Sequence, residues 1–104
     1  MFARRIIRMF RALGRDPASL ILGRQVLRSG TSVGANYREA CRARSKAEFV
    51  SKIGDCLKEA DETHYWLELL LEEKFLPARR LQPLLGEANE LVAIFTTIHK
   101  NSRG

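Results

Sequence analysis

The sequence has few of the residues on which metal sites and disulfide frameworks depend. Its 104 residues include two cysteines and two histidines, none with the close spacing of a metal site. If two antiparallel helices meet near residue 44, Cys41 and Cys56 lie at levels roughly 13 Å apart, too far for a disulfide bond. We therefore predict two reduced, structural cysteines in a cytoplasmic protein, with no metal and no cofactor.

Long hydrophobic runs are also absent, since none approaches the roughly 20 residues that a membrane-spanning helix needs. The N-terminal stretch MFARRIIRMFRAL is basic and amphipathic but lacks the apolar core of a secretory signal. Its apolar face consists of Phe2, Ile6, Met9, Phe10 and Leu13. We interpret it as a short bundle helix and expect no membrane partner; a helix lying on a membrane surface is the alternative.

Proline occurs three times, and the periodicity between the prolines is helical nearly everywhere. The pattern predicts helices at about residues 2–13, 17–42, 45–74 and 79–100. Asp16 before Pro17 is a typical helix start. Ser45 with Glu48 three residues later predicts a capping box. Pro83 leaves two alternatives, a fourth helix that begins near Gln82 or one whose first turns are kinked.

Apolar residues repeat along each predicted helix. In the second they include Leu20, Ile21, Leu27, Val33 and Tyr37, and the third and fourth have longer apolar stripes. The sequence predicts one all-α domain over residues 1–104, an antiparallel up-down four-helix bundle with a short first helix. The predicted first helix is about 18 Å long and cannot cover the third helix, which is roughly 40 Å long. The uncovered apolar edge favours self-association.

Charge is distributed unevenly along the chain. Met1–Lys46 has eleven bases and two acids, a net charge of +9, whereas Ala47–Leu76 has three bases and eight acids, a net charge of −5. The basic half can bind a polyanion or the acidic segment of another copy of this chain.

The stretch SGTSVGAN contains small residues at helical spacing. It lacks the lysine of a phosphate-binding loop, and no strand pattern precedes it. Gly30 and Gly34, one turn apart, instead predict a close helix–helix contact, because glycine inside a helix otherwise costs about 1 kcal/mol relative to alanine. Asn36 and Glu39 should form a partly buried polar seam with the third helix. Their predicted hydrogen-bond partners are Glu59 and Glu62.

The same stretch resembles the signature of the 23S ribosomal RNA intervening-sequence protein family. The family pattern runs Ser-Ile-Pro-Ala-Asn-Ile-Ala-Glu-Gly and continues into a basic turn with Arg-x-Ser-x-x-Glu-Phe. Here Ser32–Ala40 and Arg44–Phe49 are similar to it; the differences that matter are Gly34 in place of the proline and Ala40 in place of the last glycine. The segment Leu57–Leu70 is similar to the family's third helix.

The resemblance implies an antiparallel bundle that assembles into a ring, often a homopentamer. It also implies relatives that act as accessory proteins of retroelement reverse transcriptases and are thought to bind nucleic acid. A reverse transcriptase or another protein is thus a possible partner, besides RNA or DNA.

The residues themselves do not predict an enzyme, because no serine or acidic pair is placed beside an activating base. A cluster of basic residues predicts contact with nucleic-acid phosphates: Arg28, Arg38, Arg42, Arg44 and Lys46. Few aromatic residues are interleaved with them, so sequence-specific stacking is not indicated. The alternative is a structural scaffold or adaptor in which these side chains pair with acidic residues of a neighbouring subunit.

Overall fold

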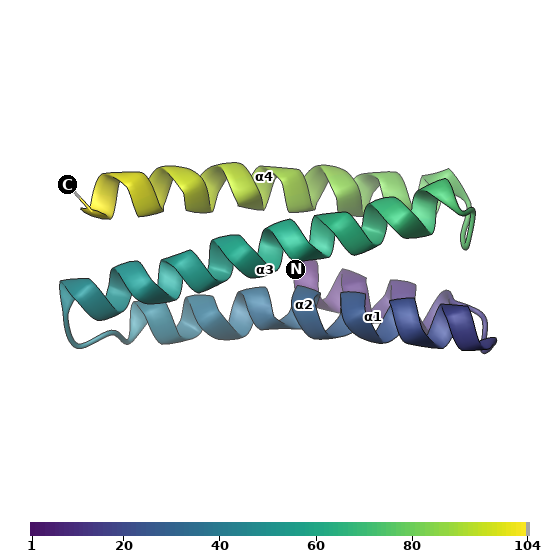
Figure 1. Ribbon diagram of the computed structural model, residues 1–104, viewed down its shortest axis with the longest axis horizontal. Coiled ribbons are helices and arrows are strands. Elements are labelled where there is room, and N and C mark those ends of the chain that lie inside the picture. Colours follow the sequence, from purple (N-terminus) through teal and green to yellow (C-terminus); the bar gives the residue numbers. More distant parts are fainter. Residues whose placement is uncertain (104) are drawn as a thin grey trace.

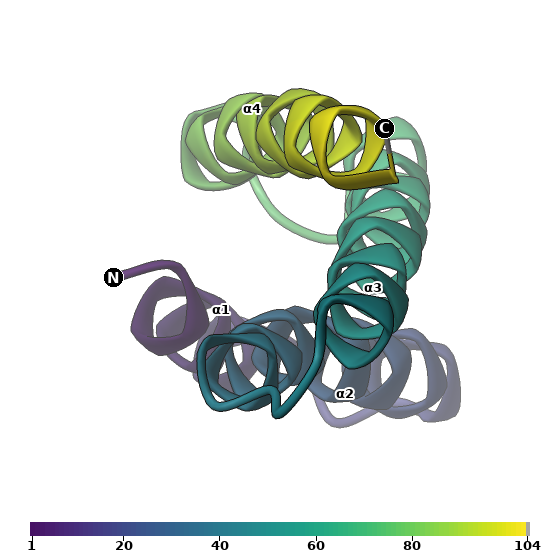
Figure 2. The same cartoon turned by 90° about the vertical axis from the view of Figure 1, so that its left-hand side faces the viewer.

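The computed structural model describes residues 1–103 and consists of four helices joined by short connections. Helix α1 covers Phe2–Ala12, α2 covers Pro17–Cys41, α3 covers Lys46–Glu72 and α4 covers Ala78–Arg103. Consecutive helices run antiparallel, and α1 also packs against α4 (Figure 1, Figure 2). The predicted all-α bundle with a short first helix is therefore confirmed.

The starts of α2 and α3 have the predicted caps. The Asp16 carboxylate accepts hydrogen bonds from the Ser19 hydroxyl at 2.7 Å and the Ser19 N–H at 3.2 Å. These bonds stabilise the ionised form and lower the pKa of Asp16. At the start of α3, the Ser45 hydroxyl accepts from the Glu48 N–H at 3.1 Å. This bond is one half of the predicted capping box; within residues 1–103 the Glu48 carboxylate does not accept from the Ser45 N–H. A short polar side chain thus determines where each long helix begins.

Helix α4 begins before Pro83. It starts at Ala78 and contains Pro83 in its second turn. Proline has no N–H to donate to the Arg79 carbonyl four residues earlier. Both residues are exposed, so water can bind this carbonyl instead. The alternative in which the helix begins near Gln82 is wrong.

The core is divided into two clusters along the bundle. One lies where all four helices are present and includes Ile6, Met9, Val26, Leu67, Leu70, Leu81 and Leu84. The other includes Val33, Ile53, Cys56, Ala60 and Phe95, and comes from α2, α3 and α4 alone. Between them the buried Thr63 hydroxyl lies 2.9 Å from the buried Ser29 hydroxyl. The bundle has four helices at one end and three at the other.

Glycines of α2 let α1 approach closely. A β-carbon at Gly30 would lie 3.0 Å from Ile6, and one at Gly23 would lie 2.9 Å from Leu13. A β-carbon at Gly34 would meet nothing within 4 Å, although the first residues of α1, Phe2 and Ala3, lie near it. The predicted close contact thus forms at Gly30, while Gly34 is exposed.

Several large apolar residues remain at the surface. Ile21 is 62% exposed and Tyr37 is 45% exposed, although both were expected on the apolar face of α2. The helix packs on α1 and α3, and these two side chains lie outside both contacts. Tyr65 on α3 and Ile94 on α4 are also half exposed, at 52% and 51%.

Candidate nucleic-acid interface

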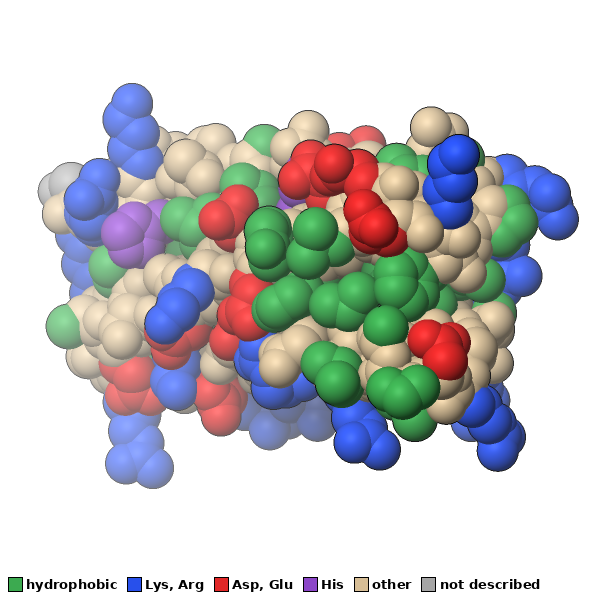
Figure 3. Space-filling view, turned by 45° about the vertical axis from the view of Figure 1, so that its right-hand side comes forward, with side chains coloured by type: hydrophobic (Ala, Val, Ile, Leu, Met, Phe, Trp, Pro, Cys, Tyr) green, Lys and Arg blue, Asp and Glu red, His purple; other side chains and the backbone are tan. Residues whose placement is uncertain are grey.

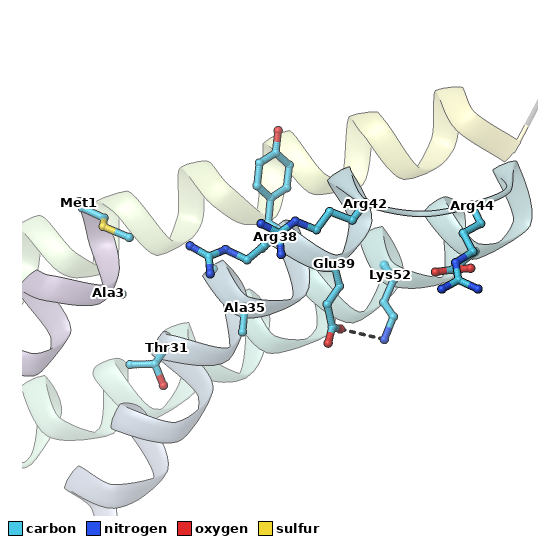
Figure 4. Close-up of a pocket in the computed structure, with 12 residues that line it drawn as sticks. Met1, Ala3, Thr31, Ala35, Arg38, Glu39, Arg42, Arg44 and Lys52 are labelled. Atoms are coloured by element: carbon cyan, nitrogen blue, oxygen red, sulfur yellow. Dashed lines mark ion pairs between the residues drawn. The ribbon is translucent and has the colours of Figure 1, made fainter.

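A basic hollow lies where the C-terminal half of α2 meets the start of α3 (Figure 4). Its volume is about 1100 Å³. Its charged lining residues are Arg38, Glu39, Arg42, Arg44, Glu48 and Lys52, and Met1, Ala3, Thr31, Gly34, Ala35 and Tyr37 complete it. Four cations against two acids leave a net charge of +2 in the hollow.

One ion pair crosses the hollow. The Lys52 ammonium lies 2.9 Å from the Glu39 carboxylate (Figure 4). Hydrogen bonding to Glu39 raises the pKa of Lys52. Because this pair is internally neutral, Arg38, Arg42 and Arg44 supply the positive charge that remains available to a ligand.

The structure brings together most of the predicted basic residues. Arg38 and Arg42 are one turn apart on α2, and Arg44 lies in the connection to α3. Lys46 is the first residue of α3; it is exposed but is not part of the lining. These four cations form the basic rim of the α2–α3 turn.

Arg28 lies apart from this rim and has partners in its own chain. Its guanidinium contacts the Glu59 carboxylate at 3.3 Å and also pairs with Glu62. The Trp66 indole N–H donates to the same Glu62 carboxylate at 3.3 Å. Arg28 therefore ties α2 to α3.

The predicted polar seam forms with different partners. Arg28, rather than Asn36 or Glu39, is the residue of α2 that meets Glu59 and Glu62. The antiparallel register explains this, because Ser29 lies beside Thr63 and Val33 lies beside Cys56. Asn36 and Glu39 are further along α2, beyond the reach of those acids. Asn36 is half-buried as expected, whereas the Glu39 side chain is 55% exposed, so its predicted burial was wrong.

Sequence reasoning missed Lys52 as a member of the hollow. Lys52 lies one turn after Glu48 on α3, which is an ordinary spacing for an intrahelical pair. The register between the antiparallel helices α2 and α3 places Lys52 opposite Glu39. Once Ser45 is identified as the cap of α3, counting outward from the turn provides a signal for this pairing.

The two cysteines have different surroundings. Both are free; Cys56 is buried and Cys41 is exposed. Burial raises the pKa of the Cys56 thiol to about 11, so it keeps its proton at neutral pH. A hydrogen bond with Cys41 raises the pKa of Tyr37. Within residues 1–103, no three His, Cys, Asp or Glu side chains are grouped as metal ligands.

Comparison with known proteins shows the family to which this fold belongs. Residues 1–97 match the family described as "23S rRNA-intervening sequence protein". The chain belongs to this family. A crystal structure of a protein of unknown function from the S23 ribosomal protein family of Bacteroides thetaiotaomicron is similar, with 38% sequence identity and a TM-score of 0.88. The match covers 95% of this chain and 92% of that one. No curated protein matches.

The signature segment of the 23S rRNA-intervening sequence protein family forms part of the basic hollow. Ser32–Ala40 is the C-terminal part of α2, and Ser45 caps α3. Of the two residues that depart from the resembled pattern, Ala40 is buried and Gly34 is exposed. Among residues 1–103, no helix is both long and apolar enough to cross a membrane.

Proposed function

We propose that this member of the 23S rRNA-intervening sequence protein family is a non-enzymatic cytoplasmic accessory protein that binds RNA or DNA with little sequence preference. The contact surface is the basic rim of Arg38, Arg42, Arg44 and Lys46. The protein acts as a homo-oligomeric ring, with five subunits favoured by the family resemblance. A nucleic acid held in a larger complex, with a reverse transcriptase or another protein, is compatible with this role.

The observation that supports this proposal is a group of four exposed cations at one end of the bundle. Within residues 1–103, none of the four has an ion-pair partner, whereas Arg5, Arg28 and Lys52 do. Like charges held close together repel one another, and phosphates relieve that repulsion while releasing condensed counterions. Arg28 is left out because Glu59 and Glu62 already neutralise it.

A ring would repeat the basic rim once in each subunit. Several weak phosphate-binding sites on one particle raise the apparent affinity for any ligand long enough to span them. We therefore expect tighter binding to long or folded RNA and DNA than to short oligonucleotides.

The test compares salt-dependent binding of two variants with equal charge. One is Arg42→Ser/Arg44→Ser/Lys46→Ser, at the basic rim. The matched control, Arg15→Ser/Arg79→Ser/Arg80→Ser, removes three exposed cations from the opposite end of the bundle (Figure 1). Fluorescent RNA and duplex DNA of the same length are titrated at several salt concentrations. Each lost phosphate contact should flatten the slope of log affinity against log salt by about 0.7 to 0.9.

The proposal requires the rim variant to lose affinity and slope while the control variant keeps both. Equal losses in the two variants would indicate attraction to net charge alone. If the wild type does not bind either ligand at low salt, the scaffold function replaces this one. Of the acids expected to pair with the arginines of a neighbouring subunit, Asp55, Glu68 and Glu72 are exposed and would then be available.

A further inference from the structure

An exposed aromatic side chain lies beside the basic rim. Within residues 1–103, the exposed aromatic residues are Tyr37 on α2 and Tyr65 on α3, with exposed fractions of 45% and 52%. Tyr37 lines the basic hollow together with Arg38 and Arg42. Proteins that bind single-stranded nucleic acids combine these two features, because cations contact the phosphates and aromatic rings stack on the bases.

The ring of Tyr37 is held in place on one side. It packs against the buried Phe95 of α4, with ring centroids 6.0 Å apart and an angle of 51° between the ring planes. A hydrogen bond with Cys41, one turn further along α2, adds a second contact. A side chain that is already positioned loses little conformational freedom when a ligand binds to it.

Gly34 leaves the space beside this ring open. A long side chain on a helix leans over the residues three and four positions before it, which for Tyr37 are Gly34 and the buried Val33. Gly34 has no side chain, and a β-carbon at this position would meet nothing within 4 Å. Gly34 and Ala35 both line the hollow. Small residues therefore leave room for a flat group to approach the ring from the hollow.

The cations of the hollow are close to the ring in sequence and in space. Arg38 follows Tyr37 directly and Arg42 comes one turn later, and both extend along the hollow (Figure 4). In a nucleic acid, one sugar joins each base to its phosphate, so a site for both needs a ring and cations close together. A duplex offers mainly its phosphates, whereas an unpaired base can leave its stack and lie on an aromatic side chain.

The other exposed tyrosine has different neighbours. Tyr65 packs edge-on against Trp66, with ring centroids 5.0 Å apart. Exposed acids lie at helical spacings from it, namely Asp61, Glu68 and Glu72. Figure 3 shows hydrophobic side chains gathered on this side of the bundle with acidic side chains beside them. Because acidic side chains repel phosphates, Tyr65 is a matched control for Tyr37.

We propose that Tyr37 stacks on an unpaired nucleobase while cations of the basic rim bind the adjoining phosphates. The protein then prefers single-stranded RNA or DNA, and the unpaired loops of folded RNA, over duplexes. This inference rests on the proposed nucleic-acid binding and adds the type of strand to it. The preference is not for a base sequence, because every base has a face that stacks on an aromatic ring.

Strands with and without bases isolate the stacking contact. One ligand is a fluorescent single-stranded DNA oligonucleotide, and the other is an abasic strand of the same length, which has the same phosphates and no bases. Both are titrated with the full chain at several salt concentrations. The wild type should bind the normal strand at least about fivefold more tightly than the abasic strand, which is the lower end of the effect expected for stacking one base.

Substitutions at Tyr37 and Gly34 test the role of the ring. Tyr37→Leu removes the flat face and keeps an apolar side chain, so it should lower the affinity for the normal strand to that for the abasic strand. Its affinity for the abasic strand and its salt dependence should not change. Gly34→Leu should have the same effect by covering the ring, since the fold has room for the new side chain. Tyr37→Phe and the matched control Tyr65→Leu should keep the wild-type preference.

The possible outcomes separate the stacking contact from phosphate binding. Equal affinities of the wild type for the two strands would overturn the stacking contact and leave phosphate binding by the basic rim. A Tyr37→Leu variant that loses affinity for both strands equally would also overturn it, because Tyr37 would then support the fold or the assembly instead. If the wild type binds neither strand at low salt, the proposed function itself fails.

Discussion

Gly30 shows how one missing side chain positions the first helix. Ile6 lies directly over it, and both residues are buried. The closeness of α1 to α2 compensates at this position for the lower helix propensity of glycine. The same residue type has no such role at Gly86, which is exposed on α4 with open space around it.

We expect Gly30→Ala to destabilise the protein by about 1–3 kcal/mol, because the added methyl group overpacks the contact with Ile6. The control Gly86→Ala should instead stabilise it by about 1 kcal/mol through helix propensity alone. Denaturant unfolding followed by circular dichroism measures both changes. A stabilising Gly30→Ala would mean that α1 yields to the new methyl group without loss.

Arg28 shows how a local sequence pattern can mislead about function. As part of a basic cluster it suggested phosphate binding, yet its two acidic neighbours come from α3, more than 30 residues away along the chain. An exposed pair of this kind contributes at most about 1 kcal/mol to stability. Its main consequence is that Arg28 is less available than the rim cations.

At the scale of elements, the end of α3 has an unusual residue. Lys74 has a φ of 58°, in the left-handed region where glycine is favoured. The Phe75 N–H donates to the Leu70 carbonyl at 3.0 Å, and the Lys74 N–H donates to the Leu71 carbonyl at 3.1 Å. These two bonds form a Schellman motif that ends α3 and directs the chain toward α4.

We expect Lys74→Gly to stabilise the protein by about 1 kcal/mol, because glycine adopts this conformation without the β-carbon clash. Lys74→Ala is the control, since it removes the same charge and keeps the β-carbon. Thermal unfolding of both variants distinguishes relief of backbone strain from an effect of charge. Equal melting temperatures in the two variants would contradict the strain argument.

At the scale of the whole molecule, the bundle is 44 Å long, but α1 covers only part of that length. An 11-residue helix spans about 16 Å. The exposed remainder of the α2–α4 surface is apolar, and covering it would remove that surface from water. Folding and the proposed assembly should therefore be coupled.

This coupling makes stability depend on protein concentration. We expect the wild-type melting temperature to rise with protein concentration. At concentrations where the protein is assembled, the free energy of unfolding per subunit should increase by about 1 kcal/mol for each tenfold increase in concentration. The Ile94→Glu variant should show a weaker dependence, because it adds a charge to the exposed apolar surface between α2 and α4. Differential scanning calorimetry over a hundredfold concentration range measures both; a wild type without concentration dependence would argue against assembly.

Much of the fold could be predicted from the sequence because its signals are local. Apolar spacing, the Asp16 and Ser45 caps and the glycines of α2 act within one or two turns, so they indicate four helices and where the long ones begin. The excess of cations near the α2–α3 turn could be read in the same way, because Arg38, Arg42, Arg44 and Lys46 are close in sequence as well as in space.

Only the tertiary structure decided which of those charges remain available and where the exposed apolar surface lies. The register of two antiparallel helices joins Arg28 to Glu59 and Glu62 across more than 30 residues, a separation that no local pattern encodes. Likewise, the position of the start of α1 determines that Gly34 faces open space while Gly30 is buried against Ile6, although both glycines have the same local sequence signal. Which ion pairs form and which apolar side chains are covered depend on the side chains that meet across the bundle. Those contacts are determined by tertiary packing.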